Sequence, residues 1–127
     1  TSGATIFATT SDIVFSGNGT ANLYGDLTGN VTTANNQGTL TIIGSSSGKA
    51  QTINGDIGTS SSLDLSTLNI GETGPLSTNY TVTTINGNVY ANSTVLNNNG
   101  TTNSSELILA SGKNITSAIS TTNAKSN

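Results

Sequence analysis

Short runs of Ile, Val and Leu alternate with Thr, Asn and Gly along most of this chain. Apolar and polar residues that alternate at period two are typical of β-strands with one buried face. Clusters of Gly, Asn and Ser separate the runs and are typical of turns. The pattern predicts strands over residues 4–8, 12–15, 21–33, 38–43, 50–57, 62–70, 79–90, 94–96, 106–110 and 113–119.

The chain also repeats itself. The run Thr52-Ile53-Asn54-Gly55-Asp56-Ile57 returns as Thr84-Ile85-Asn86-Gly87-Asn88-Val89, and a looser copy is Leu23-Tyr24-Gly25-Asp26-Leu27. Copies of one supersecondary unit, spaced by roughly 28 to 32 residues, are typical of repeat architectures. The sequence therefore predicts an all-β fold, a parallel β-helix (β-solenoid) of about four to six rungs with essentially no α-helix.

Glycine lies inside the apolar row of the repeat, at Gly55 and Gly87. It fits either a solenoid corner, where backbones stack about 4.8 Å apart, or an ordinary hairpin bend. The apolar phase also changes parity between residues 65 and 68, and again between 82 and 85. Both changes are interpreted as corners where two strands meet.

Composition supports strands over helices and excludes several partners. Charged residues make up only 7% of the chain and the net charge is −3, so weak self-repulsion favours folding over disorder. Glu, Lys, Arg and Gln are scarce, which disfavours helix. Cys and His are absent and all three basic residues are Lys, which leaves no disulfide, no thiolate metal site and no basic surface for nucleic acid.

No run approaches the roughly 20 apolar residues that cross a bilayer, so direct membrane insertion is not expected. The chain opens Thr1-Ser2-Gly3 without a signal-peptide pattern. Residues 1–127 are therefore interpreted as a single β-solenoid segment excised from a longer protein.

Candidate chemistry is sparse. Asp26 and Asp56 are predicted to occupy matching repeat positions and are the one carboxylate pair that the pattern offers. The chain has no Arg or His that could assist these carboxylates, so they are interpreted as solvent-exposed residues of a corner. No catalytic, cofactor-binding or metal-ligating residue is assigned. Asn54 and Asn86 fit either a stacked amide ladder or two unrelated surface turns.

Two further motifs are weak. Residues 44–50 resemble a phosphate-binding loop but have one residue too few between the glycines and Ala after Lys49, so they are interpreted as a turn. Thr39-Leu40-Thr41 and Thr81-Val82-Thr83 suit an ice-binding array, although such pairs do not recur in every unit.

Residues 55–63, 68–72 and 85–89 together resemble the degenerate repeat in the passenger regions of rickettsial outer-membrane protein A and B type autotransporters, the surface cell antigen family. The resemblance covers about residues 21–116. It implies a right-handed parallel β-helix on the extracellular side of the outer membrane, carried there by a separate C-terminal domain. It also implies a role in adhesion to host cells or in the surface coat.

The expected function is thus adhesion or surface display, without enzymatic activity. The alternatives are a structural spacer and, less favoured, an ice-binding or glycan-processing solenoid. Expected partners are a host-cell surface protein or glycan, bound through loops such as residues 71–79 and 97–105. End-to-end self-association is also expected unless residues 4–15 or 107–119 fold over as a cap.

Overall fold

The computed structural model describes residues 3–43, 50–72, 80–98 and 104–122. These residues contain strands and no helix, which confirms the predicted all-β class. The strands are β1 (Ala4–Ile6), β2 (Ile13–Phe15), β3 (Thr20–Leu23), β4 (Val31–Thr33), β5 (Gln37–Ile42), β6 (Ala50–Ile53), β7 (Leu65–Ile70), β8 (Val82–Ile85), β9 (Val89–Asn97), β10 (Glu106–Leu109) and β11 (Ile115–Thr122).

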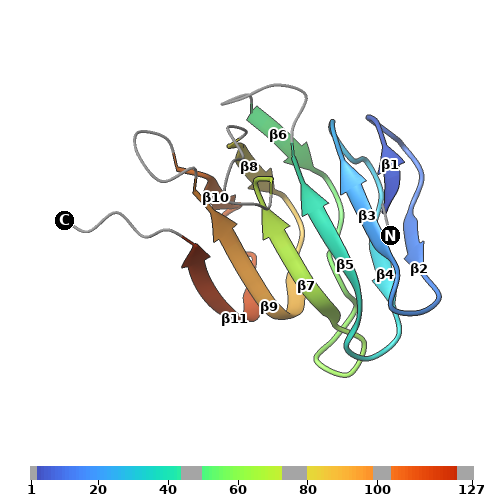
Figure 1. Cartoon of the computed structure of the whole chain (residues 1–127). Coiled ribbons are helices and arrows are strands. Elements are labelled where there is room, and N and C mark those ends of the chain that lie inside the picture. Colours follow the sequence, from blue (N-terminus) through green and yellow to red (C-terminus); the bar gives the residue numbers. More distant parts are fainter. Residues whose placement is uncertain (1–2, 44–49, 73–79, 99–103, 123–127) are drawn as a thin grey trace.

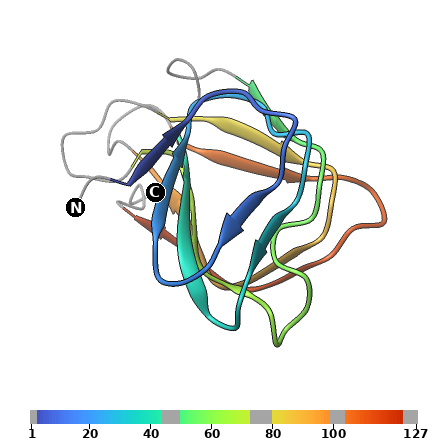
Figure 2. The ribbon, with the colours of Figure 1, turned by 90° about the vertical axis from the view of Figure 1, so that its right-hand side faces the viewer.

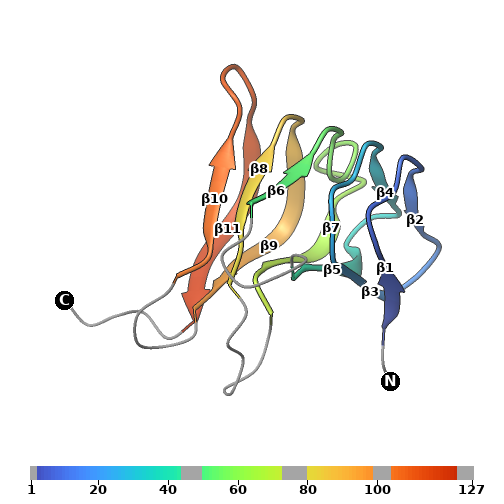
Figure 3. The same ribbon diagram turned by 90° about the horizontal axis from the view of Figure 1, so that it is seen from above.

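All pairings between these strands are parallel. A six-stranded sheet has the order β1-β3-β5-β7-β9-β11, a three-stranded sheet the order β10-β8-β6, and a two-stranded sheet the order β2-β4. Figure 1 shows the strands of the large sheet side by side in chain order. Figure 3 shows the same succession from above, with the N-terminal strands at one end and β10 and β11 at the other. The chain thus advances in one direction, and strands that pair with each other come from neighbouring passages of the chain.

Single-residue bridges extend the two smaller sheets. Leu27 bridges Thr9 and Ile53, which continues the three-stranded sheet toward the N-terminus. Ile57 bridges Val31 and Val89, which connects the two-stranded sheet to the beginning of β9. We call the six-stranded sheet wall 1, the extended three-stranded sheet wall 2 and the extended two-stranded sheet wall 3. Figure 2 shows the chain passing around one shared interior bounded by these walls.

One passage through walls 1, 2 and 3 is one circuit, and each circuit has three corners. The first corner joins wall 1 to wall 2, the second joins wall 2 to wall 3, and the third returns to wall 1. Asn54 and Asn86, which are 32 residues apart, lie on neighbouring circuits. The spacing between the repeated units is therefore one circuit.

The core consists of rows of apolar side chains that point into the interior and stack from circuit to circuit. In wall 1, Leu23, Ile42 and Ile70 align and have no exposed surface. The other fully buried aliphatic residues are Leu27, Val31, Leu40, Ile53, Ile57, Leu65, Leu68, Ile85 and Val89. Burial of each such side chain contributes about 1.5 to 3 kcal/mol, so the rows are the main source of stability.

Some predicted boundaries are wrong. The predicted strand over residues 21–33 is divided into β3, the Leu27 bridge and β4, because the chain crosses two corners there. Of the two phase changes, the one between residues 82 and 85 is not a corner, since it lies within β8. The one between residues 65 and 68 lies within β7, where Leu65 and Leu68 are both fully buried although they are three residues apart. The chain therefore turns there, as predicted, but inside one strand and not between two. In β8, Val82 is only half-buried and the neighbouring Thr83 takes the interior position, so the apolar pattern changes parity without a bend.

Candidate functional site

The most regular polar feature is a column of Asp and Asn side chains at the second corner. The backbone N–H of each member donates to the side-chain Oδ1 of the member one circuit before it. Asn30 donates to Asp12 at 2.7 Å, Asp56 to Asn30 at 2.9 Å, Asn88 to Asp56 at 2.6 Å, and Asn114 to Asn88 at 3.1 Å. We call these five residues the Asx ladder.

Backbone hydrogen bonds join the same circuits beside the Asx ladder. Val31 N–H donates to the carbonyl oxygen of Asp56 at 2.8 Å, and Ile57 N–H donates to that of Asn88 at 2.9 Å. In the four ladder residues after Asp12, the backbone carbonyl oxygen accepts one backbone hydrogen bond and the backbone N–H donates one to a ladder side chain. The bend at the second corner interrupts the hydrogen bonds between paired strands. The Asx side-chain oxygens accept from the backbone N–H groups that would otherwise lack a partner there, and an unpaired backbone group is costly. The column is a structural device that sets the register between circuits.

Glycine precedes the ladder residue in three successive circuits, at Gly29, Gly55 and Gly87. A Cβ on Gly55 would overlap the carbonyl oxygen of Gly29, and a Cβ on Gly87 would overlap that of Gly55. Glycine is required at these positions because the stacked backbones approach each other closely.

The alternative left open for Asn54 and Asn86 is resolved in favour of the stacked amides. Asn86 Nδ2 donates to Asn54 Oδ1 at 2.7 Å, and Asn54 Nδ2 lies 3.5 Å from Thr28 Oγ1. This second column lies on the same corner as the Asx ladder, two residues before it in each circuit.

The predicted pairing of Asp26 with Asp56 is wrong. Because Leu27 aligns with Ile53, Asp26 aligns with Thr52, and its Oδ1 accepts a hydrogen bond from the Thr52 N–H at 2.9 Å. Asp56 belongs to the Asx ladder instead. Since Val31 aligns with Ile57, the true third copy of the repeat is residues 27–31 and not residues 23–27, which lie at the first corner. The two carboxylates occupy different corners, so the one pair proposed for acid and base chemistry is not formed.

The threonine pairs do not form an exposed array. Thr81 and Thr83 have no exposed surface, and Thr41 is 7% exposed. Thr81 and Thr83 face the interior, where Thr81 Oγ1 lies 3.4 Å from Thr83 Oγ1. Thr41 lies on the outer face of wall 1, opposite the inward-pointing Leu40 and Ile42, and its Oγ1 accepts a hydrogen bond from Asn69 Nδ2 at 3.3 Å. The two pairs therefore lie in different walls and on different faces, and they do not form one array.

The interior also holds one polar side chain with an unsatisfied atom. Gln51 is 2% exposed and its Oε1 has no hydrogen-bond partner among the described residues. It aligns with Thr83 in the next circuit, and Thr83 aligns with Leu107 in the one after. This row of wall 2 thus holds two polar residues followed by one apolar residue.

The first corner changes most between circuits. In the second circuit Leu23 and Leu27 are separated by residues 24–26 only. In the next three circuits the connections from wall 1 to wall 2 comprise residues 43–49, 71–81 and 98–105. Most of the predicted binding loops, residues 73–79 and 99–103, lie outside the described residues, as do residues 44–49 of the phosphate-loop-like run.

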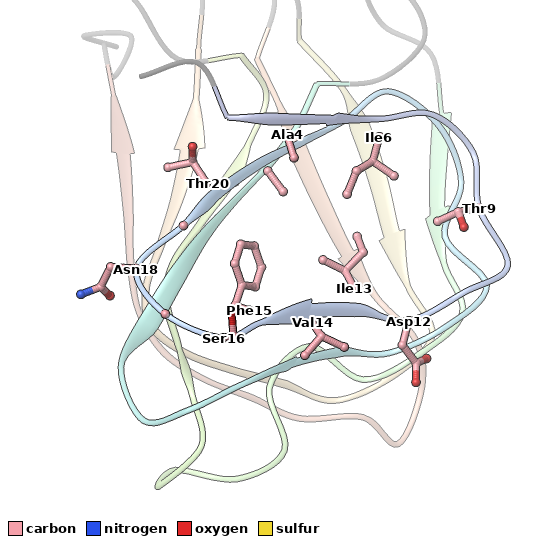
Figure 4. A pocket seen from close by; sticks show the side chains of 13 residues that line it. Ala4, Ile6, Thr9, Asp12, Ile13, Val14, Phe15, Ser16, Asn18 and Thr20 are labelled. Atoms are coloured by element: carbon pink, nitrogen blue, oxygen red, sulfur yellow. The ribbon is translucent and has the colours of Figure 1, made fainter.

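The N-terminal end of the stack is open. A pocket of about 510 Å³ is lined by residues of the first circuit, among them Ala4, Ile6, Ile13 and Phe15. Figure 4 shows Ile6, Ile13 and Phe15 converging inside that circuit, while Asn18 points away from it. Residues 4–15 and 107–119 do not cap the ends, because β1, β2, β10 and β11 run parallel to their neighbours and extend the walls.

No family model, no curated protein and no solved structure matches this chain. Among the described residues there is no group of His, Cys, Asp or Glu side chains placed to hold a metal ion. The same part of the chain contains no helix with the length and apolar character needed to span a membrane.

Proposed function

We propose that the chain forms a right-handed parallel β-helix. Three observations support this architecture: the uniform parallel pairing, the fixed order of the three walls, and the columns that align residues of successive circuits. Right-handedness is the expected sense, because connections between parallel strands of one sheet are right-handed in about 98% of cases.

Disulfide trapping tests the stacking, since the chain has no native Cys to interfere. Thr67 aligns with Thr39 on one side and with Ser93 on the other. Adjacent strands lie about 4.8 Å apart, which is within disulfide reach. Thr67→Cys combined with Ser93→Cys should therefore form an intramolecular disulfide under mild oxidation. The control pair, Thr39→Cys with Ser93→Cys, spans two circuits and should stay reduced, and an unlinked first pair would contradict the proposed stacking.

We further propose that this β-helix is a surface-displayed autotransporter passenger segment without catalytic activity, which binds a protein or glycan on host cells. It would lie on the extracellular side of the bacterial outer membrane. The observation that carries the proposal is the first corner, where the chain between wall 1 and wall 2 is longer in three successive circuits than in the second circuit. In repeat proteins, insertions gathered on one side of a rigid stack are often the binding surface.

Binding of the purified chain to cultured host cells tests the adhesive role. We expect saturable binding that unlabelled chain competes away. Replacement of residues 73–79 by a Gly/Ser run of equal length should weaken binding, because it removes first-corner side chains but keeps the strand registers. A Gly/Ser replacement of the exposed residues 34–36 at the third corner should leave binding unchanged.

A second candidate is a spacer that holds an active region away from the cell. It is favoured by the open parallel stack, in which each added circuit would lengthen the structure by about one strand spacing of 4.8 Å. A folded chain that does not bind host cells would exclude the adhesive role of this segment and favour the spacer.

A further inference from the structure

The first corner carries an exposed aromatic side chain in the first circuit. Phe7 is 71% exposed, although the core residues of wall 1 beside it are buried. Its ring pairs with that of Tyr24 in the next circuit, with ring centroids 6.0 Å apart and planes inclined by 38°. A single exposed apolar residue is common, but two rings paired across neighbouring circuits form a small fixed apolar surface. Most of the Phe7 surface stays accessible to a partner in this pair.

Polar groups lie next to this aromatic pair. A shallow depression of about 380 Å³ is lined by Ala8, Thr9, Thr10, Asp26 and Thr28. The depression extends along wall 2 from Ala8 and Asp26 at the first corner to Thr28 at the second. Ala8 follows Phe7 in the chain and Asp26 follows Tyr24 by two residues, so the rings lie toward its first-corner end.

The Asp26 carboxylate is held in a fixed position. Its Oδ1 accepts the Thr52 N–H at 2.9 Å, although the side chain itself is exposed. An ionised carboxylate offers about four acceptor sites, and this bond uses one of them. A positioned acceptor beside an open aromatic face can recognise a ligand that has both an apolar face and adjacent hydroxyl groups.

We propose that Phe7, Tyr24 and Asp26 form a binding subsite for one uncharged hexopyranose ring of a glycan. The C–H face of the sugar would stack on the aromatic pair, and two neighbouring sugar hydroxyls would donate to Asp26. The hydroxyls of Thr10 and Thr28 can donate or accept at the rim of the depression. Acidic sugars are disfavoured, because Asp26 is anionic and the chain has a net charge of −3. This inference rests on the proposed adhesive function and assigns it a ligand class.

Saturation-transfer NMR with lactose as the probe tests the subsite, using the purified 127-residue chain. We expect saturation transfer to the C–H protons of one sugar ring, and none to glucuronate under the same conditions. Phe7→Ala should weaken lactose binding by about tenfold or more, because the stacking surface is lost. Asp26→Asn should weaken it several-fold, while the amide oxygen still accepts the Thr52 N–H and keeps the fold.

The control variant is Val14→Ala, since Val14 is also an exposed apolar residue of the first circuit but lies on wall 3. It should bind lactose as the unmodified chain does. Equal binding by Phe7→Ala, or no transfer to lactose from the unmodified chain, would overturn the subsite. Host-cell binding is measured separately: cell binding that persists when lactose binding fails would remove the subsite and leave the adhesive proposal intact. Lactose binding without cell binding would remove the adhesive proposal and leave the subsite intact.

Discussion

Asp56 shows how a single side chain sets the spacing between circuits. It is the central member of the Asx ladder, and its Oδ1 accepts the Asn88 N–H at 2.6 Å while its own N–H donates to Asn30 at 2.9 Å. The aligned positions hold either Asp or Asn, which share the Oδ1 atom that the ladder uses. The acceptor oxygen, and not the charge, is therefore what this position requires.

Asp56→Ala should lower the free energy of unfolding by about 1 to 2 kcal/mol, because the half-buried Asn88 N–H would lose its acceptor. Asp56→Asn should change it by less than about 0.5 kcal/mol, since it restores the oxygen. Urea unfolding followed by circular dichroism would measure both. Equal losses in the two variants would mean that charge matters more than the hydrogen bond.

Gly55→Ala should be more disruptive than its size suggests. The added methyl group would overlap the Gly29 carbonyl oxygen, which is backbone and cannot move without displacing a circuit. We expect a loss of about 1 to 3 kcal/mol, the usual cost of overpacking. Gly17→Ala is the control, because nothing lies within 4 Å of a Cβ at that position. Comparable thermal unfolding of the two variants would argue against close backbone contact at the second corner.

At the scale of the element, β6 contains the least favourable buried group. Gln51 is 2% exposed and its Oε1 lacks a partner among the described residues. Gln51→Met keeps a long unbranched side chain and removes that oxygen, so the free energy of unfolding should rise by up to about 1 kcal/mol. Gln37→Met in β5, at a half-buried position, should have little effect. A clear loss in Gln51→Met would indicate that a bound water satisfies the oxygen in solution.

The elements were predictable from sequence where the pattern is strong. Period-two alternation correctly indicates strands and the absence of helix, and the repeated Ile-Asn-Gly run correctly pairs Asn54 with Asn86. The Asx ladder was missed because its members are 18, 26, 32 and 26 residues apart, so no fixed period finds them. The repeat was aligned incorrectly at residues 23–27, because Gly25-Asp26 has the same sequence as Gly55-Asp56 but lies at a different corner.

The subsite residues were missed for another reason. Phe7 and Tyr24 are out of phase with the inward-pointing Ile6 and Leu23, so the alternation places them on the outer face, but the sequence does not show that the two rings meet. Only the geometry places them on the first corner, with Phe7 71% exposed and paired with a residue of the neighbouring circuit.

At the scale of the whole molecule, contacts join mainly neighbouring circuits, so one circuit should be removable. Deletion of residues 58–89 would join Ile57 directly to Tyr90, and Ile57 and Val89 are equivalent positions. We expect a folded, shorter β protein with lower stability, because one interface between circuits is lost. Deletion of residues 74–89 would instead join wall 1 to wall 3 and should prevent folding. Circular dichroism and size-exclusion chromatography would distinguish the two products, and an unfolded first variant would show that the circuits are not independent units.

The open ends predict self-association, because β1 and β2 at one end and β10 and β11 at the other each pair on one side only among the described strands. Sedimentation velocity should show association that increases with concentration. Ala4→Lys should reduce it, since Ala4 lines the end pocket and a charge there would be buried on stacking. Leu63→Lys is the control, because Leu63 is 42% exposed and lies between wall 3 and β7, away from both ends. Association that persists in Ala4→Lys would place the contact elsewhere.

Both β1 and β11 belong to wall 1, and this has a mechanical consequence. A load applied between the two ends would pull across the hydrogen-bonded strands and open their bonds one after another, instead of shearing a whole strand at once. Each circuit, with 18 to 32 residues between equivalent positions, would release roughly 60 to 110 Å of chain when it yields. Under tension the molecule would therefore lengthen in a series of unequal steps at low force, and each step would dissipate part of the applied mechanical energy.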